Sequence, residues 1–169
     1  MGGAGVIITI DTREQTPWSF PAGVSAIRGT LATGDYSIQG LEHLAAIERK
    51  ELGDLVGCCT HGRERFEAEL HRLQSYRCRA VIVEASMGDV LAHRYRSQCA
   101  PAAVIASAAA WTQRYTVPFI WAGTADHAAG FALAMFNAPW RDLERLAAVM
   151  KGTAHFSTTT ATPGQEPHA

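Results

Sequence analysis

Two carboxylates and a lysine in the first third of the chain have the types and spacing of a catalytic site. Asp35 is separated by twelve residues from the run Glu48-Arg49-Lys50. Because side chains alternate along a strand, Glu48 and Lys50 are expected on one face, about 6 to 7 Å apart. If Asp35 lies on the preceding antiparallel strand, a turn near residues 40–42 brings it nearly opposite Glu48. The pattern therefore predicts two carboxylates beside one ammonium group.

Further acids extend this cluster. Asp11 follows a short apolar run, Glu14 comes soon after it, and Asp54 follows Lys50. Crowded carboxylates repel one another and raise their pKa values unless a cation lies among them. Their oxygens suit Mg²⁺ or Mn²⁺, and such an ion acidifies bound water and neutralises charge on a phosphodiester. Lys50 could orient or deprotonate that water, or stabilise the transition state.

Each of these residues also has an ordinary structural interpretation. Asp54 suits the first turn of a helix, where an acid interacts favourably with the helix dipole. Asp11 and Asp35 suit turns that follow strands, and Glu48 suits a solvated strand surface. Taken singly, these interpretations are at least as good as a catalytic one. Taken together, acids at the ends of adjacent apolar strands favour a site, although D…ExK alone is only a moderate signal.

The elements that would position these residues alternate between strand and helix. Apolar and β-branched runs predict strands at residues 5–10, 24–28, 31–38, 43–50, 80–85 and 117–121. Apolar residues at helical spacing and helix-favouring composition predict helices at residues 52–59, 63–76, 101–115, 126–136 and 140–150. The strands before residue 51 are expected to form an antiparallel meander. The order indicates an α/β fold in which helices flank a mixed sheet on both faces.

Length and composition set further bounds. A chain of 169 residues fits one domain, expected at residues 1–151, and the polar residues 152–169 predict a disordered tail. The net charge of −1 excludes a strongly basic DNA-binding protein, so DNA contacts would come from local patches. The four cysteines lack CxxC spacing, and no apolar run approaches the ~20 residues of a membrane span. These features predict a cytoplasmic protein that makes no membrane contact and joins the nucleoid when bound to DNA.

Several strings resemble the nuclease domain of the XPF-type structure-specific endonucleases. They are Asp11-Thr12-Arg13-Glu14, Gly34-Asp35-Tyr36, Glu48-Arg49-Lys50 with Asp54, and Arg63-Glu64-Arg65-Phe66 before a helix and a strand. That family's GD…ERK…D signature is a specialised PD-(D/E)xK site of restriction-endonuclease-like proteins. The resemblance runs from about Val6 to Met150.

The resemblance implies a restriction-endonuclease-like fold and a metal-dependent DNA endonuclease of DNA repair, acting on branched or single-strand-containing DNA. It implies that Asp35 and Glu48 bind Mg²⁺, for which Mn²⁺ substitutes, and that Lys50 is the catalytic lysine. Asp11 and Asp54 would complete the acidic cluster, with Asp11 as a further metal ligand.

The same resemblance assigns supporting roles. Arg49 is expected to turn to the opposite face and brace the motif by pairing with an acid, and Glu14 is a second structural residue. Arg13 and an arginine of the following helix are expected to bind substrate. Arg63 matches the family's glycine-arginine string, because it follows Gly62. Arg65 with Glu69 better matches the family's positions along the helix, so both arginines remain candidates.

The resemblance also implies a homodimer formed through the nuclease domain. Relatives that cut forks and flaps usually append a tandem helix-hairpin-helix module, and the residues after Met150 contain none, so a protein partner is expected to supply additional DNA binding. Two other functions stay open. One is a non-catalytic DNA-binding partner subunit, although such paralogues generally lose the acids that this chain keeps. The other is an RNA-directed nuclease.

Overall fold

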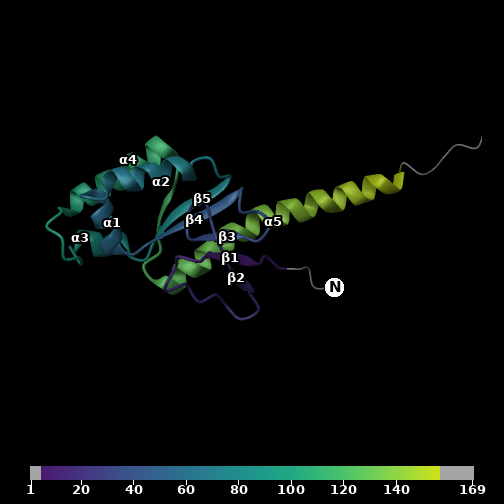
Figure 1. Cartoon of the computed structure of the whole chain (residues 1–169), viewed down its shortest axis with the longest axis horizontal. Helices are drawn as coiled ribbons and strands as arrows, with labels where there is room; N and C mark the ends of the chain where they lie inside the picture. Colours follow the sequence, from purple (N-terminus) through teal and green to yellow (C-terminus); the bar gives the residue numbers. More distant parts are fainter. Residues whose placement is uncertain (1–4, 157–169) are drawn as a thin grey trace, which may run out of the picture.

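Six strands form one mixed sheet in the computed structural model, which describes residues 5–156 (Figure 1). The strands are β1 (Ile8–Asp11), β2 (Ala26–Gly29), β3 (Tyr36–Ile38), β4 (Ala45–Lys50), β5 (Cys78–Val83) and β6 (Phe119–Trp121). Their order is β2-β1-β3-β4-β5-β6. Strand β3 is antiparallel to both neighbours, and the other neighbouring pairs are parallel.

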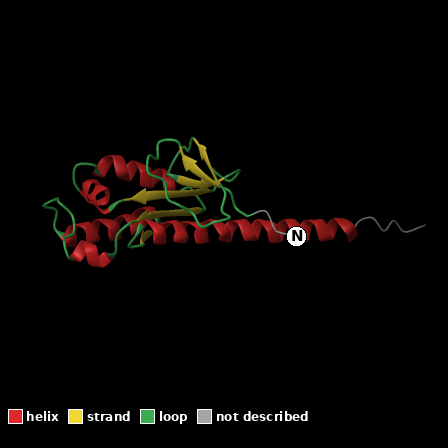
Figure 2. Ribbon diagram, turned by 90° about the horizontal axis from the view of Figure 1, so that it is seen from below, coloured by secondary structure: helices red, strands yellow, loops and turns green. Residues whose placement is uncertain are grey.

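Helices cover both faces of this sheet, as the sequence predicts. They are α1 (Leu52–Cys59), α2 (Arg63–Leu73), α3 (Met87–Leu91), α4 (Pro101–Tyr115) and α5 (Ala125–Phe156). On β5, Val81 and Val83 pack in a core with α1, α2 and α4, whereas Ala80 and Ile82 pack in a second core with α5. Figure 2 shows the long helix α5 on one side of the sheet and a shorter helix on the other side, at the upper left of the picture. The apolar run of β5 is therefore buried on both faces.

The predicted antiparallel meander is wrong in one place, because β2 runs parallel to β1. A tight turn would have produced an antiparallel pair, but residues 12–25 form a long loop that returns the chain to the starting end of β1. Trp18 anchors this loop to Tyr36 of β3. Its ring stacks on Tyr36 with 4.2 Å between centroids, and its backbone N–H donates to the Tyr36 hydroxyl at 2.8 Å.

Helix α5 is one continuous helix, where the sequence predicts two helices separated at residues 137–139. Pro139 lies inside it and lacks an N–H, so the Met135 carbonyl loses its usual helical partner. The thiol of Cys78 donates to that carbonyl at 3.6 Å, which supplies a replacement. The helix also passes the predicted domain end at residue 151, and residues 157–169 of the expected tail lie outside the described residues.

The second half of α5 projects well beyond the sheet (Figure 1). It carries exposed apolar side chains, including Leu143 and Leu146. Even so, none of the helices within residues 5–156 combines the length and apolar character needed to cross a membrane.

Candidate active site

The candidate active site lies where β3 begins and β4 ends. Tyr36 pairs with Ile47 across the two strands, which places Asp35 beside Glu48. The Asp35 N–H donates to the Ile47 carbonyl at 2.8 Å, and the Arg49 N–H donates to Asp35 Oδ2 at 2.8 Å. The register is the one that the sequence predicts, and it ties the Asp35 carboxylate to β4.

Gly34 makes this approach of the two strands possible. Its φ is +76°, in the region that glycine adopts readily, and a Cβ at this position would lie 2.9 Å from the Ile47 carbonyl oxygen. The chain therefore passes too close to β4 for any side chain. This accounts for the Gly-Asp string of the motif.

Glu48 and Lys50 share one face of β4, and the Lys50 ammonium contacts Glu48 Oε1. Lys50 Nζ also lies 5.1 Å from the centroid of the Phe66 ring on α2. The second carboxylate oxygen, Glu48 Oε2, is buried and has no hydrogen-bond partner within residues 5–156. A buried polar oxygen without a partner is unfavourable, and a metal ion bound at this oxygen would relieve that cost.

Burial and nearby negative charge raise the pKa values of both acids. Burial raises the pKa of Asp35 to about 6. Burial likewise raises the pKa of Glu48 well above its usual range, and the charge of Asp35 adds to this effect while Lys50 opposes it. Burial disfavours the charge of Lys50, but the neighbouring Glu48 outweighs it and raises the lysine pKa. The two carboxylates therefore need additional positive charge before both ionise readily.

An open cavity of about 330 Å³ lies over these residues. It is called the acidic cavity below and is lined by Arg13, Glu14, Gln15, Thr16, Asp35, Glu48, Arg49, Lys50, Glu51 and Asp54. Five of these side chains are acidic and three are basic. The predicted acids Asp35, Glu48 and Asp54 thus meet with Lys50 in one place.

The donor set suits a hard divalent ion held by few protein ligands. Among the described residues, no group of three His, Cys, Asp or Glu side chains is arranged to hold a metal. Asp35 and the unpartnered oxygen of Glu48 provide two carboxylates. Mg²⁺ commonly binds through one or two carboxylates and keeps several waters, so this pair fits it.

Asp11 lies next to Asp35, because its backbone N–H donates to the Asp35 carbonyl at 2.8 Å, but its side chain does not line the acidic cavity. It is 1% exposed, and both of its carboxylate oxygens are occupied. Oδ1 accepts from the Arg13 backbone N–H at 2.9 Å and from Arg13 Nε at 2.6 Å, and Oδ2 accepts from the Leu31 N–H at 2.7 Å. Burial alone would raise the Asp11 pKa, but these hydrogen bonds lower it. Asp11 closes the loops around the site, and this geometry gives no support to its predicted metal role.

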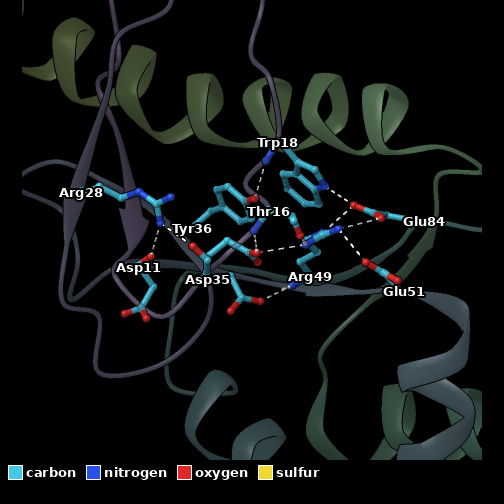
Figure 3. Close-up of polar contacts among 10 residues, drawn as sticks. Asp11, Thr16, Trp18, Arg28, Asp35, Tyr36, Arg49, Glu51 and Glu84 are labelled. Atoms are coloured by element: carbon cyan, nitrogen blue, oxygen red, sulfur yellow. Dashed lines mark hydrogen bonds and ion pairs between the residues drawn. The ribbon is translucent and has the colours of Figure 1, made fainter.

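Arg49 points to the opposite side of β4, where it pairs with acids from three segments (Figure 3). Its Nε and Nη2 donate to the two oxygens of Glu84 at 2.6 and 3.1 Å. Nη1 donates to Glu14 at 3.1 Å, and Nη2 donates to Glu51 at 3.0 Å. The indole N–H of Trp18 also donates to Glu84. These ion pairs connect Arg49 with Glu14, Glu51 and Glu84, as expected of a residue that braces the motif.

The structure separates the three arginines predicted to bind substrate. Arg63 turns toward α4, where its Nη2 donates to Ser107 Oγ at 2.7 Å and its Cζ lies 4.9 Å from the Trp111 ring centroid. It does not line the site. Arg65 faces a cavity that Lys50 also lines. Arg13 lines the acidic cavity with a side chain that is 70% exposed.

Two acids near the site were not among the predicted site residues. Glu69 on α2 is half-buried, and its charge adds to the effects that raise the pKa values of Asp35 and Glu48. The sequence could have indicated Glu69, because it lies four residues after Arg65 and therefore on the same side of the helix. Glu84 follows β5 directly and holds Arg49. The sequence could have indicated Glu84, because it is an acid directly after an apolar strand.

Comparison with known proteins identifies the family. A family model described as the ERCC4 domain matches residues 10–135. The chain belongs to the ERCC4 domain family. This result confirms the predicted resemblance to XPF-type nuclease domains. No match is found among curated proteins.

Solved structures agree on the fold of this ERCC4 domain. XPF from Aeropyrum pernix is similar with a TM-score of 0.61 and 21% identity, over 96% of this chain and 68% of that one. The same archaeal protein in complex with DNA is similar with a TM-score of 0.63 and 22% identity, over 81% of this chain and 66% of that one. The chain thus spans about two thirds of the length of each of these structures.

Proposed function

We propose that this ERCC4 domain is a metal-dependent endonuclease that hydrolyses phosphodiester bonds in DNA. The observation that carries the proposal is the buried Oε2 of Glu48, which has no hydrogen-bond partner within residues 5–156. It lies beside Asp35, in a side chain paired with Lys50. Membership of the ERCC4 domain family supports the proposal. So does the fold shared with an archaeal XPF whose structure was determined in complex with DNA.

In this proposal Asp35 and Glu48 hold Mg²⁺, or Mn²⁺ in its place. When bound, the ion supplies a Lewis acid that activates water and neutralises charge on the phosphodiester. Asp54, exposed at the rim, adds negative charge to the acidic cavity. The Arg49 network keeps the strand ends fixed, so that both acids are in position before substrate arrives.

Lys50 could either deprotonate the attacking water or stabilise the transition state, and its environment favours the second role. Glu48 raises the pKa of Lys50, so the side chain remains a cation at neutral pH. A cation cannot accept a proton from water, but it stabilises negative charge that builds on a phosphate during attack. Lys50 is therefore an electrostatic stabiliser of the transition state in this proposal.

The substrate and assembly rest on the family resemblance. The substrate is branched or single-strand-containing DNA, cut by a homodimer, with a protein partner that adds DNA binding. Arg13 and Arg65 are the cationic side chains that would contact the DNA backbone from the rim of the site. Such contacts weaken as salt concentration rises.

A cleavage assay tests the proposal. Labelled duplex, single-stranded, flap, fork and RNA substrates are incubated with the purified protein in Mg²⁺, Mn²⁺ or chelator. The expected result is metal-dependent cutting of DNA that is lost in Asp35→Ala and Lys50→Ala. Arg145→Ala is the control, because that side chain is 79% exposed and does not line the acidic cavity.

Three results would contradict the proposal. Cleavage by folded Asp35→Ala would remove the metal site from the reaction. Cutting of RNA alone would favour the RNA-directed alternative. DNA binding without cutting in any lane would favour the non-catalytic partner subunit.

A further inference from the structure

A second cavity of about 390 Å³ lies next to the acidic cavity, at the turn from α1 to α2. It is called the basic cavity below and is lined by Lys50, Gly53, Asp54, Gly57, Cys58, His61, Gly62 and Arg65. Lys50 and Asp54 line both cavities. The two spaces therefore share a wall made by the catalytic lysine and its neighbouring acid.

The two cavities differ in charge. Acidic side chains outnumber basic ones in the acidic cavity. In the basic cavity Asp54 is the one acid in the lining, against Lys50 and Arg65 and an additional histidine. A cation suits the first space and an anion suits the second.

Lys50 is paired with Glu48, but the Arg65 side chain of the basic cavity is available to a ligand. Arg65 is exposed and makes no hydrogen bond or ion pair within the part of the chain that is described. Arg63, two residues earlier, contrasts with it, because Arg63 is engaged by Ser107 and Glu67. An unpaired arginine beside an acidic cluster is a ready partner for a phosphate, whose oxygens match the guanidinium fork.

His61 presents a second polar group to the same space. Its Nδ1 lies 3.2 Å from Thr60 Oγ1, whereas its Nε2 has no partner among residues 5–156. A Cβ built on Gly57 would stand 3.9 Å from His61 Nε2, so the imidazole ring packs over the Gly57 backbone. A Cβ on Gly53 would meet nothing within 4 Å, so a ligand can approach the backbone closely there.

We propose that the basic cavity binds the phosphate adjacent to the scissile phosphate on the cleaved strand, through Arg65 and His61. This inference rests on the proposed function. The scissile phosphate belongs with the ion at Asp35 and Glu48, and the shared wall of Lys50 places the next anion beside it. Holding two consecutive phosphates fixes the strand relative to Lys50, which aligns the reacting bond.

A scan of neutral phosphates tests the inference by cleavage. DNA substrates carry a single methylphosphonate, which removes the charge of one phosphate, at each position around the cut. For the wild-type protein, one position next to the cut is expected to slow cleavage about tenfold or more, the size of a lost charge-assisted hydrogen bond. Arg65→Ala and His61→Ala are expected to slow cleavage of normal DNA and to abolish the added effect at that position.

Matched controls come from residues outside both cavities. His43→Ala and Arg145→Ala replace an exposed histidine and an exposed arginine, and neither residue lines either cavity. Both variants should keep wild-type cleavage and the same methylphosphonate profile. The inference is wrong if the profile of Arg65→Ala and His61→Ala also matches the wild type.

A binding measurement separates this inference from the proposed function. The same DNAs are titrated into Asp35→Asn, and into Asp35→Asn with Arg65→Ala, in chelator, with fluorescence anisotropy as the readout. One methylphosphonate position should weaken binding only when Arg65 is present. Coupling without any wild-type cleavage would overturn the proposed function and leave the basic cavity only as a DNA phosphate site. Cleavage without coupling would overturn only the basic-cavity assignment. Absence of DNA binding would overturn the assignment as well.

Discussion

The backbone N–H of Arg49 holds the Asp35 carboxylate at 2.8 Å, while the Arg49 side chain reaches the opposite side of β4. One residue thus connects an acid of the candidate metal site to Glu84 after β5 and to Glu14 in the loop after β1. The position of Asp35 depends on β4, and the guanidinium network fixes β4 to its surroundings.

Removing this guanidinium should cost much of the domain's stability. In Arg49→Ala, Glu84 and Glu14 lose their cationic partner, and these side chains, each 10% exposed, keep charge that no cation compensates. We expect the free energy of unfolding to fall by about 3 kcal/mol or more. Urea denaturation measures it, with Arg145→Ala expected within about 0.5 kcal/mol of wild type. Similar losses in the two variants would show that the network does not brace the site.

Two glycines with similar backbone geometry provide a matched test of the Asp35 position. Gly34 and Gly40 have φ values of +76° and +80°, but a Cβ on Gly34 would lie 2.9 Å from Ile47 O while one on Gly40 would meet nothing within 4 Å. Gly40→Ala should cost about 1 kcal/mol of backbone strain. Gly34→Ala should cost at least about 1 kcal/mol more and should also slow cleavage, because it moves Asp35. Equal losses of stability in denaturant titrations would contradict this interpretation.

The raised pKa of Asp35 predicts a specific pH dependence. The pKa of this carboxyl is about 6 in the folded protein, above its ordinary value of 3.8, so folding favours the protonated acid. Without divalent ions, stability should fall as pH rises from about 4 to 6, by up to about 3 kcal/mol for this group. Asp35→Asn lacks this loss and keeps an oxygen to accept from the Arg49 N–H. The difference in unfolding free energy between the two proteins should therefore grow over this pH range, and a constant difference would refute the prediction.

Divalent ions should reverse that loss. At pH 7 Mg²⁺ binds only the folded state of the wild type, so it should raise the unfolding free energy by about 2 to 3 kcal/mol at about 100-fold excess over its Kd. Asp35→Asn and Glu48→Gln should gain little. Thermal denaturation with Mg²⁺ and with chelator measures the effect. Equal stabilisation of all three proteins would place the ion elsewhere.

The local parts of the site could be predicted from the sequence. The alternation that puts Glu48 and Lys50 on one face is a property of any strand, and the turn before β4 sets the register with Asp35. The same alternation turns Arg49 to the other side. Continuous apolar runs such as β5 indicated a sheet covered on both faces, which is what the structure has.

Contacts between distant segments could not be predicted. The Asp11 carboxylate accepts from the N–H of Leu31, which lies in the loop between β2 and β3. Arg63 is drawn from the site by Ser107, a residue of α4 that lies 44 positions along the chain. Helix α5 continues through Pro139 with a thiol from β5 bonded to the freed carbonyl. In each case a partner far away in sequence decided between two locally reasonable outcomes.

The occupancy of the carboxylate pair is the central claim, and a crystal soaked in Mn²⁺ tests it most directly. The account predicts an anomalous-scattering peak at a coordination distance of about 2.1 Å from Glu48 Oε2 and from an oxygen of Asp35. Asp11 should stay bonded to Arg13 and Leu31 and should not contact the ion. A well-ordered crystal with no peak between Asp35 and Glu48, or with Mn²⁺ bound only at other acids, would contradict the account.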